Sequence, residues 1–426
     1  MKHRFDAVLL VAAVLLSAAA VFVLVHDLMP AEGSPEAVAT EVARLIRERA
    51  VVQQDDGVLA LAAANGMATA LDPYSAAWSA TEYQHESQRT AGHYAGIGVM
   101  LGETSRGLTV FEIIAGGPAS SSTLAPLDVI SSIDGVVVPS VRPLVHVRGR
   151  LAGPAGTQVL LQVRRHADNS ESSITLTRGS VDQPSAYGAM LDAENGLGVL
   201  VIESFFLNTA QQARAAVDAM LAQGLKGLVL DLRDNPGGVL DAGADVARLF
   251  LGNEVLIVQT IGRSGSRELR AALEAPFATL PLVVLVDKRS ASASEVVAAA
   301  LQDHARAPLL GERTYGKGVV QQITALRSLP GAALRLTTAH HYAPSGRCIE
   351  KSIGLDPQAA GRGGLVPDVG LVLDAAAQVS ADALRLSWRY TAAVRAELQQ
   401  ETPMQDAQLD AALDILRGKP PQDRKL

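Results

Sequence analysis

After residue 180 the sequence alternates short apolar segments with helix-like segments, and this alternation constrains the fold more than any other feature. The apolar segments and the helix-like segments that follow them are 197–202 before 209–223, 227–232 before 239–250, and 281–286 before a helix that begins near residue 292. Strands that are apolar at nearly every position are buried on both faces, as in parallel sheets whose strands are joined through helices. The sequence therefore predicts an α/β fold with a mainly parallel sheet covered by helices.

Three serines occur where the third of these apolar segments leads into its helix. Residues 289–295 read RSASASE, so small hydroxyl side chains lie at a helix N-terminus, where free N–H groups and the helix dipole favour negative charge. Ser292 is the leading candidate for a nucleophile, and Ser290 and Ser294 are local alternatives. Ser292 and Glu295 also fit a capping box, a purely structural role that the pattern alone does not exclude.

Lys317 follows Ser292 by 25 residues and is flanked by Gly316 and Gly318. A lysine that is desolvated can lose its proton near neutral pH, and a serine can be activated by a lysine without histidine. The following segment, 319–323, is typical of a strand, which places Gln321 on the same side as Lys317 and within reach of its amine. Taken alone, Lys317 would be interpreted as a solvated surface residue.

The segment 230–238 (LDLRDNPGG) is typical of a strand that ends in a glycine turn before a helix. A tight turn that needs positive φ explains its glycines without any function. The functional interpretation gives one oxyanion donor to the backbone N–H of Gly237 or Gly238, and the other to the N–H of Ala293.

Other chemistries have weaker support. His304, His340 and His341 could each serve a serine, but the chain has no Gly-x-Ser-x-Gly elbow. It has no His-Glu-x-x-His motif, and Cys348 is its single cysteine, so neither a zinc protease nor a multi-cysteine metal site is expected. We expect no metal and no cofactor. The formal net charge of −7 also argues against a nucleic-acid partner.

The N-terminus carries a charge-free stretch of 19 residues, 7–25, preceded by Lys2 and Arg4. This length is sufficient to span a bilayer, and the basic residues predict that the N-terminus stays in the cytoplasm. A cleaved signal peptide, with the small residues 18–20 at the cleavage site, is the alternative. The apolar run continues past that site, which favours an uncleaved anchor.

The pattern predicts five regions: the anchor or signal segment 1–29, a helical region 30–90, a β-rich module 91–170, the strand–helix core 171–373, and a C-terminal helical region and tail 374–426. In the first helical region an amphipathic face is formed by Val38, Val42, Leu45 and Ile46. Short helices cannot bury such a face alone, so we expect the terminal helices to pack on the main body or to join copies of the chain as a homo-oligomer.

Seven segments in order resemble the C-terminal processing peptidases, also called tail-specific proteases. They are 71–75 (LDPYS), 96–99 (GIGV), 231–238 (DLRDNPGG), 290–295 (SASASE), 311–321 (GERTYGKGVVQ), 342–347 (YAPSGR) and 367–369 (PDV). The resemblance implies a crotonase-like protease core, with Ser292 as the nucleophile, Lys317 as the general base and Gln321 as the residue that positions the lysine.

The resemblance also implies that the β-rich module is an inserted PDZ domain. PDZ domains bind an extended peptide at a sheet edge and capture its terminal carboxylate with backbone N–H groups. Gly96, Ile97, Gly98 and Val99 would form that carboxylate loop.

Three departures from the family pattern stand out. Leu127 replaces a usual glycine, and Cys348 replaces a usual serine. Ala152 stands where many relatives have an arginine that helps to couple the PDZ domain to the protease, with Arg150 as a candidate substitute. This third departure favours delivery of substrate by the PDZ domain over gating.

These inferences predict a membrane-anchored serine endopeptidase of the cytoplasmic membrane, with a single span and its catalytic domain in the periplasm or another extracytoplasmic space. Its expected partners are protein substrates with free apolar C-termini, and an activating adaptor protein is a further candidate. The alternative is a catalytically silent PDZ adaptor that only binds peptides. The intact Ser292, Lys317 and Gln321 argue against this alternative.

Overall fold

The computed structural model describes residues 33–139, 143–351, 363–401 and 404–419 of the chain. The described residues form two compact units, one within 1–80 and 323–336, the other within 81–322 and 337–426. Within the described ranges no helix is long and apolar enough to cross a membrane. The predicted membrane segment, 7–25, lies outside those ranges.

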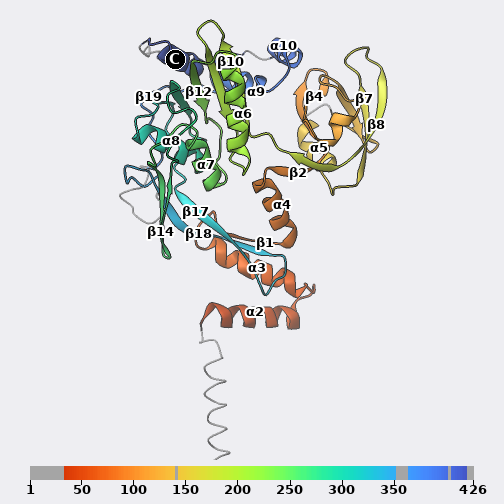
Figure 1. Cartoon of the computed structure of the whole chain (residues 1–426). Coiled ribbons are helices and arrows are strands. Elements are labelled where there is room, and N and C mark those ends of the chain that lie inside the picture. The colour runs from red at the N-terminus through yellow and green to blue at the C-terminus, as the bar shows by residue number, and fades with distance from the viewer. Residues whose placement is uncertain (1–32, 140–142, 352–362, 402–403, 420–426) are drawn as a thin grey trace, which may run out of the picture. The chain divides into compact units, whose positions relative to one another are not determined.

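The second unit contains the predicted parallel sheet (Figure 1). Its strands, in spatial order, are β10 (Ala186–Asp192), β11 (Leu197–Ile202), β12 (Gly227–Asp231), β15 (Leu282–Val286), β16 (Leu309–Gly311) and β19 (Val369–Gly370). All neighbours from β11 to β19 are parallel, and β10 is an antiparallel edge strand. The α/β prediction is confirmed.

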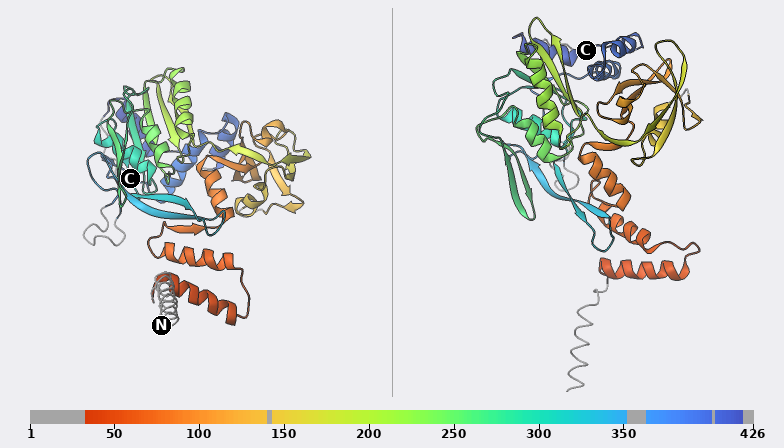
Figure 2. Two further views of the ribbon diagram at one scale, coloured as in Figure 1. Left: turned by 60° about the horizontal axis from the view of Figure 1, so that its bottom comes forward. Right: turned by 45° about the vertical axis from the view of Figure 1, so that its right-hand side comes forward.

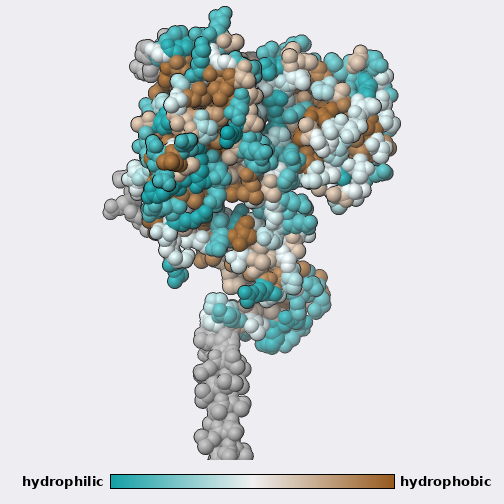
Figure 3. All heavy atoms as spheres, in the orientation of Figure 1, coloured by the Kyte–Doolittle hydropathy of each residue, from teal (hydrophilic) through white to brown (hydrophobic). Residues whose placement is uncertain are grey.

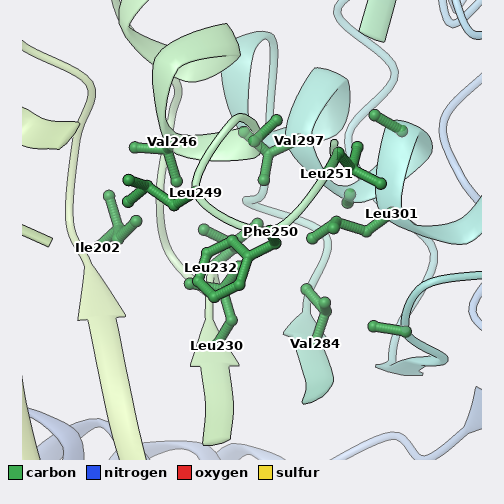
Figure 4. Packing of buried hydrophobic residues seen from close by; sticks show 14 of the residues in the cluster. Ile202, Leu230, Leu232, Val246, Leu249, Phe250, Leu251, Val284, Val297 and Leu301 are labelled. Carbon is green, nitrogen blue, oxygen red and sulfur yellow. The ribbon is translucent and has the colours of Figure 1, made fainter. Parts of the chain in front are cut away.

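Helices cover both faces of this sheet because its strands are apolar on both sides. On one face α6 (Thr209–Leu221), α7 (Leu240–Ala247) and α8 (Ala293–Asp303) pack on alternate strand residues, and α11 (Ala407–Leu416) packs on the other face. The views in Figure 2 show α6 lying along β10, with which it makes contacts. Figure 4 shows Leu230 and Val284 pointing from the strands toward Val246, Val297 and Leu301 of α7 and α8.

The β-rich module has its own antiparallel sheet and its own apolar core. It consists of β3 (Val99–Thr104), β4 (Gly107–Ile113), β5 (Val129–Ile133), β6 (Val136–Val137), β7 (Gln158–Arg164) and β8 (Glu171–Thr177), with the short helix η1 (Pro118–Ser121) and α5 (Pro143–Leu151). The strands β2 (His93–Gly96) and β9 (Gly179–Asp182) pair and join its two ends. β8 continues to Thr177, past the predicted boundary at residue 170.

A further sheet brings together segments that the sequence did not link. Within the second unit β13 (Leu256–Gly262) pairs with β14 (Gly265–Arg270) and with the C-terminal part of β18 (Ala333–Tyr342), where Gln259 is opposite Tyr342. The predicted strand 319–323 is β17 (Val319–Ala325), which pairs with β18. Lys317 lies in the loop just before β17, so its place is not set by the strand alternation that the sequence suggested.

The first unit contains α2 (Pro35–Arg49), α3 (Asp56–Thr69) and β1 (Ala76–Trp78), which pairs with the start of β18. The Arg335 guanidinium lies over the Trp78 ring, 4.7 Å from its centroid. With α4 (Ala80–Thr90), these helices agree with the prediction for 30–90, apart from β1. Val38 and Val42 are 50% and 48% exposed and Leu45 and Ile46 are half-buried, so the predicted amphipathic face is only partly covered here.

The C-terminal region is helical, as expected, with α9 (Ala375–Ser387), α10 (Ala392–Glu401) and α11. Leu409 and Leu413 of α11 are buried in the core beneath the sheet. The wholly buried Arg233 guanidinium joins this region to the end of β12, with bonds of 2.6 Å to Asp231 and 2.7 Å to Asp406. On the face shown in Figure 3, hydrophobic residues are interspersed with hydrophilic ones.

Candidate active site

Ser292 lies directly before α8, in the loop that leaves β15. Its φ is +56°, a left-handed value that residues other than glycine rarely adopt. An ordinary N-cap residue has an extended backbone instead. The predicted capping box between Ser292 and Glu295 is present, and in it the Ser292 N–H donates to Glu295 Oε2 at 2.9 Å. Backbone strain of this kind concentrates at functional sites, and it distinguishes Ser292 from a serine that only caps a helix.

The two neighbouring serines are buried and their hydroxyls are already used. Ser290 Oγ donates to the Leu232 carbonyl at 2.7 Å, and Ser294 Oγ donates to the Asn235 carbonyl at 2.9 Å. Both side chains are inaccessible, whereas Ser292 is half-buried. Of the three candidates, only Ser292 can meet a substrate without rearrangement. Ser290 and Ser294 instead hold the loop against the end of β12.

The Glu295 carboxylate ties the Ser292 segment to the Lys317 segment. Oε2 accepts the N–H groups of Ser292 and Lys317, at 2.9 and 2.8 Å, and Oε1 accepts the Gly316 N–H at 2.7 Å and the Thr314 hydroxyl at 2.5 Å. Burial raises the pKa of this carboxyl group, and these four hydrogen bonds act in the opposite direction. The sequence pattern indicates only a capping role for Glu295, because its second set of donors is about 20 residues away.

Lys317 is half-buried in a loop whose backbone is held on both sides. The Gly318 N–H donates to Glu350 Oε2 at 2.6 Å, and the Gly318 carbonyl accepts the His341 N–H at 2.7 Å. A Cβ on Gly318 would collide with the Glu350 backbone, so the glycine allows the close backbone approach that the sequence suggested. The structure therefore fixes the backbone that carries Lys317.

Gln321 lies on β17 and donates to Thr337 Oγ1 of β18 at 3.4 Å. Its predicted bond to the Lys317 amine stays a prediction. Val319 lies two residues before Gln321 on β17, which pairs with β18. The Val319 carbonyl lies 3.1 Å from Nε2 of His341 on β18.

Histidine is a poor alternative base in this site. Burial lowers the pKa of His341 to about 4, with a smaller contribution from the nearby Lys317 charge. His341 is therefore neutral at pH 7 and too weakly basic to take a serine proton efficiently. His304 lies at the other end of α8, with Nε2 2.7 Å from the Leu256 carbonyl, and His340 is on β18 opposite Ile261.

The glycine turn after β12 contacts the candidate nucleophile directly. A Cβ on Gly237 would lie 2.7 Å from Ser292 Cβ and 2.9 Å from Ala293 N, so only glycine fits there. The Gly237 N–H is already bound, since it donates to Asn235 Oδ1 at 2.9 Å. The N–H groups of Gly238 and Ala293 make no hydrogen bond within the part of the chain that the structure describes. Of the two predicted glycine donors, the geometry therefore favours Gly238, with Ala293 as its partner.

The predicted carboxylate loop of the β-rich module borders a cavity of about 360 Å³, called here the tail cavity. Its lining comes from the loop and β3 (Ile97, Gly98, Val99, Met100, Leu101), from α5 and the next residue (Leu144, Val147, Leu151, Ala152), and from Tyr94, Ile114, Gln183, Pro184, Glu203 and Arg389. Gly96 lies at the end of β2, directly before this lining. The cavity is apolar near α5 and charged at Glu203 and Arg389.

Two carbonyls of the loop are bound inside the module. The Ile97 carbonyl accepts the Ala119 N–H at 2.8 Å, and the Gly98 carbonyl accepts the Ile114 N–H at 2.9 Å. In a trans peptide the next N–H points the opposite way, which directs the N–H groups of Gly98 and Val99 away from these partners. Gly98 has a φ of +76° and faces Gly117 closely, so the turn requires glycine. This arrangement suits the capture of a carboxylate.

Comparisons with known proteins show which proteins the chain is similar to. Residues 196–360 match peptidase family S41, and residues 95–176 match the PDZ domain. The carboxyl-terminal-processing protease of Synechocystis sp. is 35% identical over 68% of this chain and 68% of that protein. The carboxy-terminal processing protease CtpA of Bacillus subtilis is 33% identical over 71% of this chain and 64% of that protein. A solved photosystem II D1 C-terminal processing protease, 27% identical, covers 80% of this chain and 93% of its own, with a TM-score of 0.46.

Proposed function

The chain belongs to the carboxyl-terminal processing proteases and is a serine-type peptidase with a PDZ domain, and from this premise we propose that it cleaves proteins whose C-terminal tails its PDZ domain has bound. The proposed endopeptidase is anchored in the cytoplasmic membrane by one span, with its PDZ and catalytic domains in the periplasm. The catalytic set is Ser292, Lys317 and Gln321.

In the proposed reaction Ser292 Oγ attacks the scissile carbonyl carbon while Lys317 Nζ takes the hydroxyl proton. The oxyanion of the tetrahedral intermediate accepts the N–H groups of Gly238 and Ala293. When the C–N bond breaks, Lys317 returns the proton to the leaving amine. Water then attacks the acyl-ester with Lys317 again as the base, which releases the acid product and restores Ser292.

One observation carries the proposed mechanism. The strained Ser292 backbone and the Lys317 backbone are held by the same buried oxygen, Glu295 Oε2, at 2.9 and 2.8 Å. A helix cap needs only the first of these bonds. The second has a clear use if the two side chains act together, since a misplacement of about 1 Å can cost on the order of 10²-fold in rate.

The location is proposed from the sequence. The charge-free segment 7–25 behind Lys2 and Arg4 supports a single span with the rest of the chain outside the cytoplasm. Half-exposed Val38 and Val42 on α2 support association of copies through the terminal helices. We include an activating adaptor protein in the proposal, as a candidate partner.

Cleavage and fractionation test the proposal together. The full chain, purified in detergent, is expected to cut a peptide substrate with a free apolar C-terminus, and Ser292→Ala is expected to bind this peptide without cutting it. Binding without cleavage by both proteins would instead identify the silent PDZ adaptor. In cells the protein is expected to stay in membranes through a carbonate wash. A soluble form beginning near Val21 would show a cleaved signal peptide.

A further inference from the structure

Arg389, in the connection between α9 and α10, lies at the charged end of the tail cavity. Its guanidinium binds two carboxylates from different parts of the second unit. Nε donates to Glu112 of the PDZ domain at 2.6 Å, and Nη1 donates to Glu203, just after β11 of the protease sheet, at 2.9 Å. The Arg389 side chain is only 4% exposed, so these bonds form away from bulk water.

The guanidinium keeps capacity for a further acceptor. Burial opposes its charge, but Glu203 and Glu112 raise the pKa of Arg389, so it stays charged. Nη2 is buried and makes no hydrogen bond to the described residues. A carboxylate that enters the tail cavity would therefore meet a cation with a donor to offer, at a place where two other carboxylates already bind.

The PDZ side of this contact reaches the strand that borders the cavity. Glu112 is opposite Met100 in the pairing of β4 with β3, and Met100 lines the cavity. The neighbouring residues are packed as well, since the rings of Phe111 and Tyr390 meet edge-to-face with centroids 5.2 Å apart. The Arg389 segment is thus held on the PDZ domain by an ion pair and an aromatic contact.

The protease side reaches the glycine turn at the candidate nucleophile. The Gly237 carbonyl accepts both the Ser204 hydroxyl and the Phe205 N–H, each at 3.0 Å. These two residues directly follow Glu203 in the chain. A shift of Glu203 would therefore act on the turn whose Gly238 N–H is the proposed oxyanion donor.

This inference rests on the proposed function. We propose that Arg389 is a positioning residue that transmits occupancy of the tail cavity to the glycine turn, a gating role in place of the delivery that Ala152 alone favours. The carboxylate of a bound tail competes with Glu203 for the Arg389 guanidinium, and the released Glu203 segment lets the turn settle around the oxyanion. Ala152 lines the same cavity without any charge, and Arg150 is exposed and does not line it. The cation at this place therefore comes from Arg389, and Arg150 is not its substitute.

The test measures how fast a fluorophosphonate probe labels Ser292 in the full chain, with and without a short apolar peptide that ends in a free carboxylate. We expect the peptide to raise the labelling rate on the order of fivefold or more, and its amidated form to have little effect. Arg389→Gln and Glu203→Gln should lose this response. Glu397→Gln is the matched control, because it breaks the 3.0 Å ion pair with Arg106 away from the cavity and should keep the response.

Peptide binding to the Ser292→Ala chain, measured by fluorescence anisotropy, separates the possible failures. Binding and labelling in the wild type without any response to the peptide would overturn the role of Arg389 and leave the protease intact. A full response in Arg389→Gln would do the same. Absence of labelling at Ser292, or of peptide binding, would overturn the proposed function itself. If Arg389→Gln does not fold, as judged by circular dichroism, the result from Glu203→Gln decides.

Discussion

The start of α8 and the tail cavity hold their polar groups in different ways. At the start of α8, Glu295 is fully buried and accepts four hydrogen bonds, three of them from backbone N–H groups. At the tail cavity, Glu112 and Glu203 are each 26% exposed and share one guanidinium. Removing a partner from a fully buried network costs more than disturbing an ion pair whose carboxylates are partly exposed. The first region is therefore built to stay fixed, and the second is able to exchange partners.

The largest effect is expected from removing the proposed base, Lys317, whose backbone is held by Glu295 at the start of α8. Lys317→Met is expected to reduce peptide cleavage on the order of 10⁴-fold or more, because a nucleophile and its base act as a unit. Lys288→Met, an exposed lysine close to the serine run, is the matched control and should keep the wild-type rate. Cleavage that survives Lys317→Met would show that another group takes the Ser292 proton.

A change at Glu295 tests whether the buried network sets the catalytic geometry. In Glu295→Gln an NH₂ group replaces one oxygen and faces donors, which should reduce activity on the order of 10²-fold and lower the free energy of unfolding by about 1–3 kcal/mol. Kinetics and urea unfolding would measure the two effects. Glu312→Gln, at a half-buried position, is the control and should change neither the activity nor the free energy of unfolding. Wild-type kinetics in Glu295→Gln would contradict the idea of a fixed site.

The buried His341 on β18, whose N–H binds the Gly318 carbonyl next to Lys317, predicts how the free energy of unfolding depends on pH. Its pKa is about 4 in the folded protein and near 6.5 in the unfolded chain, so the unfolded chain binds more protons between these values. The free energy of unfolding should therefore fall as the pH falls, by about 2 kcal/mol from pH 7 to pH 5. Urea unfolding of His341→Phe should lack this part of the decline, and His304→Phe should keep it. An equal slope in all three proteins would rule out the buried neutral imidazole.

The smallest expected effect on cleavage comes from a change in what the tail cavity binds. Amidating the C-terminus of a peptide substrate removes the charge that the loop at Gly98 and Arg389 would bind, so cleavage should slow by about tenfold without stopping. Hydrolysis of a small activated ester, which has no tail, should not depend on the PDZ domain. Equal rates on free-acid and amidated tails would show that the tail cavity does not recognise the carboxylate.

The two regions also differ in how far the sequence predicted them. The strand, loop and helix around Ser292 are continuous in sequence, and apolar runs with a capping pattern are sufficient to place them. The backbone N–H that remains free in the glycine turn could not be predicted, because it depends on Asn235 taking the Gly237 N–H. The sequence pattern predicts Gly237 or Gly238 as the oxyanion donor, and the structure favours Gly238.

The longer-range parts could not be inferred from local patterns. Gln259 is opposite Tyr342 in the second sheet, and Arg389 reaches Glu112 across most of the chain. Neither contact leaves a periodic signal in the sequence. The sequence shows Ala152 in place of the family arginine and offers Arg150 nearby, whereas the arginine that lines the tail cavity together with Ala152 is Arg389.

We propose Ser292 as the nucleophile because Ser290 and Ser294 are locked in hydrogen bonds and because Glu295 holds the Lys317 backbone together with that of Ser292. The most direct measurement is to map the fluorophosphonate adduct by mass spectrometry in the wild type, Ser294→Ala and Lys317→Met. We predict one adduct, on Ser292, in the wild type and in Ser294→Ala, and its loss in Lys317→Met. An adduct on Ser290 or Ser294, or undiminished labelling of Lys317→Met, would contradict it.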